Sequence, residues 1–382
     1  MIIRFRRFTR PGFLKTIRRE LLARFLREFE PELGAQNLSL PDLNLAEEAY
    51  FGSLARLLSA PEGLPERLTE ALVAVDEMAS PDGQEQLEAA VAGTGLPLTF
   101  DPRSTLADLA IQVWLAAPEL LAGLHNQRRL RRLTAFEIFG SGLRPDQRRP
   151  FSAPDQAALE ALAAALEPWF ARHHRGCNTV RVEVYPFPGE FWFVVRHGDT
   201  FSPTPKVEEQ KTEILHFRPE KDDVVVYVLE HDELRINART KGERDLYVRT
   251  FGLCLGGRPD YFDQAGAYTL EPLRTEGPDA LDTGGLEGLR KVVLRELEVA
   301  WDRGRHEVIT WEAEDIFRAA PASVAPHDGR LARAAFDFHF ADSRRPRPVE
   351  IRLPNLLKLG RHCDFQLVDR FLCQRGFRRH DA

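Results

Sequence analysis

Hydrophobic positions in the first part of the chain recur at helical spacing. Apolar residues between Phe13 and Leu26 recur every three or four positions, and most of the arginines lie outside that stripe, as in an amphipathic helix. Proline and glycine separate this segment from further periodic ones. We therefore expect helices across residues 11 to about 175, including Pro118 to Phe139 and Asp155 to His173.

After Gly176 the period changes to two. Val180, Val182 and Val184 alternate with polar or larger residues, which is typical of a half-buried strand. The Pro-rich stretch SPTPKVEEQK is expected to be a charged loop. The strands expected in this part cover residues 180–185, 191–196, 212–218, 224–229 and 233–238, and a helix is expected over 243–255.

The same order of five strands followed by a helix recurs in the last part of the sequence. Expected strands cover 268–273, 291–301, 307–311, 334–340 and 348–353, and a helix covers 364–374. The string Glu-Leu-Arg-Ile at 233–236 matches Glu-Ile-Arg-Leu at 350–353. Chance similarity between two strand-then-helix segments is the alternative to a duplication.

The predicted fold class is therefore α+β. An all-helical N-terminal domain, 1–175, precedes a duplicated antiparallel domain with five strands and a helix in each repeat, 178–257 and 266–380. By analogy of shape alone, paired sheets of this kind form a saddle or cradle whose open face meets a ligand or partner.

Composition excludes several classes of protein. The chain has 382 residues, of which 43% are hydrophobic and 29% charged, as in a globular protein. The formal net charge of -6 argues against a uniformly basic nucleic-acid coat. The four cysteines form no C-x-x-C pair, and no apolar run approaches the roughly 18 residues that cross a bilayer. We expect a cytoplasmic protein with reduced thiols and no membrane contact.

Cofactor and metal motifs are missing from the sequence. There is no Walker A loop, no G-x-G-x-x-G and no H-E-x-x-H. His173, His174 and Cys177 are closely spaced, but no fourth ligand is near, and a helix C-terminus by itself favours the two imidazoles. We therefore expect no cofactor and no metal.

The most specific short motif in the sequence is Phe193-Val194-Val195-Arg196-His197-Gly198. It resembles the strand-to-loop R-H-G motif of the histidine phosphatase superfamily. The resemblance implies that His197 accepts a phosphoryl group while Arg196 holds phosphate oxygens. A strand end followed by a glycine turn is the competing interpretation, and no partner histidine stands out downstream.

A second string resembles the carboxylate-and-lysine arrangement of PD-(D/E)xK nucleases. Asp199 is followed by Glu209-Gln210-Lys211. The resemblance implies that Asp199 and Glu209 hold Mg²⁺ and that Lys211 supports the attacking water. Solvated charges in a loop are the alternative.

Arginines gather in patches. Because guanidinium groups bind phosphate oxygens, such patches are candidates for contact with nucleic acid or an acidic protein surface. A solvated surface paired with neighbouring acids is the alternative. The arginines in question are Arg128, Arg129, Arg131, Arg132, Arg375, Arg378 and Arg379.

The sequence thus favours a non-enzymatic binding or adaptor protein that contacts nucleic acid through arginine-rich patches. Two alternatives stay open. One is a phosphoesterase of either of the two kinds above, and the other is an interaction subunit of a larger multi-protein assembly.

Overall fold

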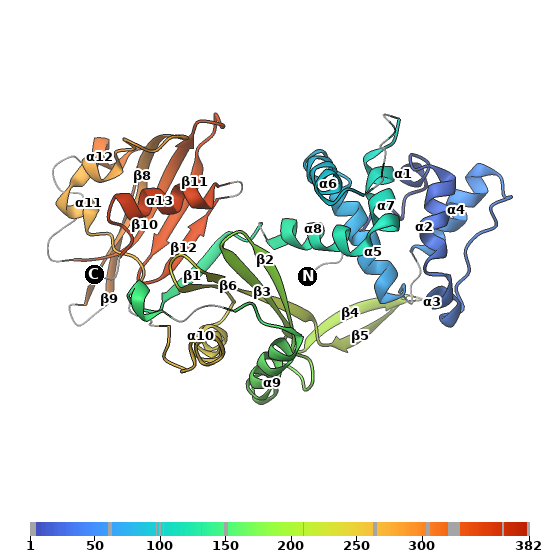
Figure 1. The fold of residues 1–382 in the computed structure, drawn as a ribbon, viewed down its shortest axis with the longest axis horizontal. Coiled ribbons are helices and arrows are strands. Elements are labelled where there is room, and N and C mark those ends of the chain that lie inside the picture. Colours follow the sequence, from blue (N-terminus) through green and yellow to red (C-terminus); the bar gives the residue numbers. More distant parts are fainter. Residues whose placement is uncertain are drawn as a thin grey trace. The chain divides into compact units, whose positions relative to one another are not determined.

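The chain is a mixed α+β protein that divides into two compact units, Met1–Arg131 and Arg132–Ala382. Its structure is a computed structural model (Figure 1). The structure describes residues 5–59, 63–96, 98, 101, 103–130, 132–148, 152–208, 210–262, 266–302, 306–319, 329–360 and 363–379. No helix in these ranges is long and apolar enough to cross a membrane.

The first unit is helical. Its core is built from the apolar faces of eight described helices, and the rings of Phe25, Phe29 and Trp114 contact one another within it. Thr105 caps α7 in a capping box with Asp108. The helices are α1 Pro11–Leu14, α2 Arg19–Arg27, α3 Glu30–Ala35, α4 Glu47–Leu57, α5 Glu66–Met78, α6 Pro81–Thr94, α7 Leu106–Ala116 and α8 Pro118–Leu130.

The helix expected over Pro118 to Phe139 is wrong in its second part. Helix α8 ends at Leu130, and Ala135–Gly140 forms strand β1. Backbone hydrogen bonds from strands far away in sequence stabilise this extended segment, which local spacing cannot reveal. The all-helical domain expected over 1–175 extends beyond the first compact unit, which ends at Arg131, and β1 belongs to the second unit.

The second unit contains one sheet of ten antiparallel strands in the order β2-β3-β6-β7-β1-β12-β11-β10-β8-β9. Strand β1 lies in the middle, between β7 and β12, and is antiparallel to both. The other strands are β2 Arg181–Phe187, β3 Glu190–Gly198, β6 Glu220–Val228, β7 Glu233–Asn237, β8 Leu289–Asp302, β9 His306–Glu312, β10 Arg330–Phe340, β11 Arg347–Arg352 and β12 Leu356–Leu359.

Helices cover the two halves of this sheet on opposite faces. Ile138 in β1 belongs to the core under one set of helices, and its neighbour Phe139 belongs to the core under the other set. Consecutive residues of a strand point to opposite faces, so the two cores lie on opposite sides of one sheet. The saddle with one shared open face that we expected is therefore not formed.

Five helices provide these two layers. Helices α9 Gln156–Arg172 and α10 Lys241–Gly256 pack on the half formed by β2, β3, β6 and β7. Helices α11 Pro272–Thr275, α12 Ile316–Ala319 and α13 Phe365–Gln374 pack on the other half. Figure 1 shows α13 lying over the strands of that half.

Two expected strands differ from the structure. The segment 268–273 is not a strand of the sheet, because only Tyr268 forms an isolated bridge and α11 begins at Pro272. The segment near 212–218 is a strand, but it leaves the large sheet. It is β5 Lys211–Phe217, which pairs with β4 Ser202–Glu208 in a separate two-stranded sheet. The stretch expected to be a loop is therefore largely β4.

Candidate functional site

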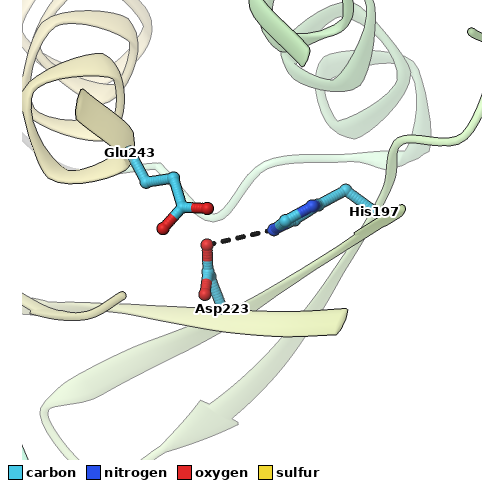
Figure 2. Close-up of side chains that lie close together, drawn as sticks. All are labelled: His197, Asp223 and Glu243. Carbon is cyan, nitrogen blue, oxygen red and sulfur yellow. Dashed lines mark hydrogen bonds and ion pairs between the residues drawn. The ribbon is translucent and has the colours of Figure 1, made fainter. Parts of the chain in front are cut away.

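A buried cluster of polar side chains lies between the sheet and α10 (Figure 2). His197 at the end of β3 and Asp223 in β6 are each 1% exposed, and Glu243 in the first turn of α10 is fully buried. Strand alternation explains the position of His197, because Phe193 and Val195 on the same face of β3 belong to the core under α9 and α10. Burial of three ionisable groups together requires compensating partners.

Lys221 supplies the main positive charge in this cluster. Its Nζ lies 3.0 Å from Asp223 Oδ1 and 2.9 Å from both carboxylate oxygens of Glu243. Tyr247 in α10 donates its hydroxyl hydrogen to Asp223 Oδ2 at 2.8 Å. Burial would raise the pKa of Asp223, but the contact with His197 and the charge of Lys221 outweigh it, so that pKa lies below its usual value.

Both ring nitrogens of His197 face acceptors. Nδ1 lies 2.8 Å from the carbonyl oxygen of Gly198, and Nε2 lies 3.1 Å from Asp223 Oδ2. A carbonyl and a carboxylate can only accept, so both contacts are hydrogen bonds when the ring carries two protons. The ring also stacks on Phe170 of α9 with 4.1 Å between centroids. His197 is thus held at both ring nitrogens and on one face of its ring.

The cluster has the donor types of a metal site. One ligand atom from each of His197, Asp223 and Glu243 lies within 4.8 Å of the others. An imidazole and two carboxylates suit a transition metal. However, the ammonium of Lys221 contacts both carboxylates, and Glu243 Oε2 also accepts the N–H of Thr240 at 2.8 Å. The arrangement fits an internal ion pair that fastens the start of α10 to the sheet better than it fits a metal.

Asp199 lies beside this cluster and is held by two guanidinium groups. Arg175 bonds to Asp199 Oδ1 and lies 3.5 Å from Glu243, and Arg239 lies 3.2 Å from Asp199 Oδ2. Burial would raise the pKa of Asp199, but the N–H of Thr200 and the charge of Arg175 and Arg239 outweigh it, so that pKa is lowered. Asp199 is a paired carboxylate.

The two residues of the phosphatase-like string point away from each other. His197 faces the core under α9 and α10, and Arg196, the preceding residue of β3, faces the opposite side of the sheet. There Arg196 Nε lies 3.1 Å from Asp222 and 3.3 Å from Glu220. The structure does not bring the imidazole and the guanidinium to one phosphate.

The residues of the nuclease-like string are also apart. Asp199 follows the end of β3, whereas Lys211 is exposed at the far end of β5. A strand advances about 3.3 Å per residue, so the seven residues of β5 place Lys211 roughly 20 Å from the base of the hairpin. Glu209 lies outside the described residues.

The arginines expected in the first patch have interaction partners within the chain where they are described. Arg128 donates to Ser80 Oγ at 2.7 Å and lies 3.5 Å from Asp82. Arg129 and Arg132 have interaction partners as well. Arg131 lies outside the described residues.

The arginines near the C-terminus differ in environment. Arg378 is buried and forms ion pairs with both Glu233 and Asp369. Arg375 pairs with Asp282 at 2.6 Å. Arg379 is exposed, and within the described part of the chain its side chain has no ion pair. The sequence does not separate these three cases, because exposure depends on which face of the fold each residue occupies.

A second buried ionic cluster surrounds Arg378, and sequence reasoning missed it. Arg235 in β7 bonds to Glu233 at 2.8 Å and stacks over Phe365 of α13, with its guanidinium 4.0 Å from the ring centroid. The only sequence signal for this cluster is the spacing of Glu233 and Arg235 in β7, which places both side chains on the same face of the strand. Alternation by itself does not tell whether the charged face of a strand is covered, and here α13 and the chain end bury it.

Among the described residues of the second unit, the most exposed large apolar side chains lie on or directly beside the β4–β5 hairpin. Every residue of β5 is exposed. Large apolar side chains stand out along it, at 72% exposed for Val207, 61% for Phe201 and Ile214, 52% for Leu215 and 40% for Phe217. Sequence reasoning placed most of β4 in a loop because of its two prolines.

Comparison with known proteins adds no family. No protein-family model matches the chain, and no curated protein matches it with significance.

Proposed function

We propose that the chain is a non-enzymatic binding protein that serves as an interaction subunit of a larger assembly. The observation that carries this proposal is the β4–β5 hairpin, a two-stranded sheet that pairs with no other described strand. It exposes four large apolar side chains, and Phe201 is exposed directly before β4. The register places Val207 and Ile214 on one face of the hairpin and Leu215 and Phe217 on the other. Exposed large apolar side chains gathered on one element mark a site of protein contact.

The physical chemistry of an isolated hairpin supports this proposal. Two strands without a third strand or a helix to pack on are marginally stable in water. The apolar side chains of β4 and β5 gain burial only when another surface covers them. Each large side chain that becomes fully buried contributes about 1.5–3 kcal/mol.

The positions of the candidate catalytic groups also favour binding over phosphoester chemistry. His197 is enclosed, with both nitrogens and one ring face in contact with other groups. Asp199 is neutralised by two arginines, and Lys211 is far from it along the hairpin. A phosphoesterase of either kind would need these groups to converge on one substrate.

Contact with nucleic acid has weaker support. Arg128, Arg375 and Arg378 form ion pairs within the chain, which lowers the positive charge available to phosphates. Arg379 is the exposed exception near the C-terminus.

Size-exclusion chromatography of a tagged chain in lysate from its native cells tests this proposal. We expect the wild type to elute in an assembly well above the mass of a dimer of the 43.4 kDa chain. The double variant Val207→Ser, Ile214→Ser should leave that assembly. Leu253→Ser in α10 is the matched control, because Leu253 is also about half exposed but lies away from the hairpin. Elution of the hairpin variant with the wild type would contradict the proposal.

We also propose that the two halves of the sheet derive from a duplication. Each half contains a four-stranded antiparallel meander followed by a helix, β2-β3-β6-β7 with α10 and β8-β10-β11-β12 with α13. Strands β7 and β12 end these meanders and flank β1 in the same direction. The hairpin interrupts the first meander, and β9 with α12 interrupts the second. Each repeat thus contributes a different set of strands from the five we expected.

A further inference from the structure

We propose that two copies of the chain associate through the outer edge of β5, so that their hairpins form one four-stranded sheet. This inference rests on the proposed function and names the partner of the hairpin as a second copy of the same chain.

The prolines of β4 show which backbone groups of β5 point outward. Pro203 pairs with His216, and Pro205 pairs with Ile214. Proline has no N–H, so both pairs occupy positions of the ladder where neither residue bonds to its partner. The N–H and C=O groups of Ile214 and His216 therefore point away from β4. By alternation, those of Thr212 do the same.

The two edges of the hairpin are unequal. On the outer edge of β4, two of the outward positions are Pro203 and Pro205, which cannot donate a hydrogen bond. On the outer edge of β5, Thr212, Ile214 and His216 each offer one donor and one acceptor. Prolines commonly protect an edge strand against association, and here they protect only one of the two edges. The edge of β5 is open to an added strand.

The sequence of β5 fits an antiparallel copy of itself. Ile214 is the central residue of Lys211–Phe217, so a two-fold axis at Ile214 pairs all seven residues of the strand. Ile214 then faces its own copy, Glu213 faces Leu215, and Lys211 faces Phe217. No like charges stand directly opposite, which would destabilise the pair. Outward groups meet outward groups in this register, so the main-chain hydrogen bonds are complete.

The same geometry limits this edge-to-edge pairing to two copies, and it leaves the faces of the hairpin open to the larger assembly. The resulting sheet has the order β4-β5-β5-β4, and both of its outer edges carry Pro203 and Pro205. An isologous pair of this kind is closed, because no open edge remains to recruit a third copy. Ile214 and Pro205 of both copies form a continuous apolar band across one face of the sheet.

Sedimentation equilibrium of the purified full-length chain tests the proposal. We expect a concentration-dependent dimer for the wild type. Ile214→Pro removes an outward N–H from β5 without removing a bond inside the hairpin, and should weaken the dimer at least tenfold. Val207→Pro is the matched control, because it removes an outward N–H from β4, and it should dimerise like the wild type. Thr212→Pro provides a second β5 variant if Ile214→Pro does not fold, as judged by circular dichroism.

Two outcomes would overturn the inference. A wild-type chain that stays monomeric at all concentrations excludes self-association and leaves the proposed function to be judged by its own lysate assay. Dimers that tolerate both Ile214→Pro and Thr212→Pro place the interface elsewhere.

Discussion

Arg378 and Glu233 form a buried ion pair although they lie 145 positions apart in the chain. Glu233 is in β7, and Arg378 follows α13 close to the C-terminus. The pair joins the first half of the sheet to the last segment of the fold, and Asp369 in α13 completes it from the other side of the guanidinium. An arginine that sequence reasoning assigned to nucleic-acid contact thus holds the second unit together.

Arg378→Ala should destabilise the protein strongly. The substitution leaves Glu233 and Asp369 buried without their cation, and breaking a buried ion pair in this way costs about 3–5 kcal/mol. Urea unfolding followed by circular dichroism measures the change. The neighbouring Arg379→Ala is the control and should cost less than about 0.5 kcal/mol, because Arg379 is exposed. An equal loss of unfolding free energy in the two variants would show that the buried ion pair does not stabilise the protein more than an exposed arginine does.

Lys221→Met should also lower stability, by about 3 kcal/mol or more, since Asp223 and Glu243 both lose the ammonium that compensates them. Lys211→Met on the exposed hairpin is the control and should change the free energy of unfolding little. Thermal melting of both variants with and without added Zn²⁺ or Mn²⁺ gives a further check. A melting temperature of the wild type that rises with metal would mean that the ion displaces Lys221 and that the cluster is a metal site after all.

Stability should fall on acidification below about pH 5. Contacts with His197 and Lys221 keep the pKa of Asp223 below its usual value despite burial, and the contact with His231 and the charge of Arg378 do the same for Asp369. The unfolded chain therefore binds protons at these two carboxylates before the folded chain does. Their stabilising effect is complete above the unfolded pKa near 3.8 and is lost as the pH falls through the folded pKa.

Urea midpoints measured from pH 7 to pH 3 follow this loss. Asp223→Asn should start lower at neutral pH and decline less steeply, because one of the two shifted carboxyls is gone. An unchanged slope in that variant would show that Asp223 is not a source of the acid sensitivity.

Gly198→Ala should destabilise the end of β3. A Cβ at this position would overlap the backbone carbonyl oxygen of Arg175 and crowd the side chain of Arg218, so the strand end or the Arg175 loop has to move. We expect a loss of about 1–3 kcal/mol, as for overpacking in a core. Gly52→Ala in α4 is the control, because no described atom beyond its chain neighbours and the backbone of its own helix lies within 4 Å of its Cβ position, and alanine favours a helix. A Gly198→Ala variant as stable as the wild type would mean that the glycine is not required for close packing.

Local pattern determined much of the secondary structure of this chain. The 3.6-residue spacing predicted the helical character of the first unit and the bounds of α9 within a few residues, and period-two alternation predicted β2, β3, β6 and β7. Each of these elements buries one face, and therefore its hydrophobic residues recur in the sequence at the period of a helix or a strand. Strand β1 shows a weaker alternation of hydrophobic and polar residues, because both of its faces pack against hydrophobic cores. The strands that bond to it are also far away in sequence.

Tertiary structure alone decided the roles of the charged residues. Arg196 and His197 are neighbours in sequence, yet the pleat of the strand directs them to opposite faces of the sheet. Arg196 pairs with Asp222 on one face, whereas His197 is buried in the core on the other. Arg378 and Arg379 are equally adjacent, and only the packing of the chain end against β7 buries one and exposes the other. Residue type and spacing set which interactions each charged side chain can make. Burial and contacts with residues far away in sequence decide which of these interactions it makes.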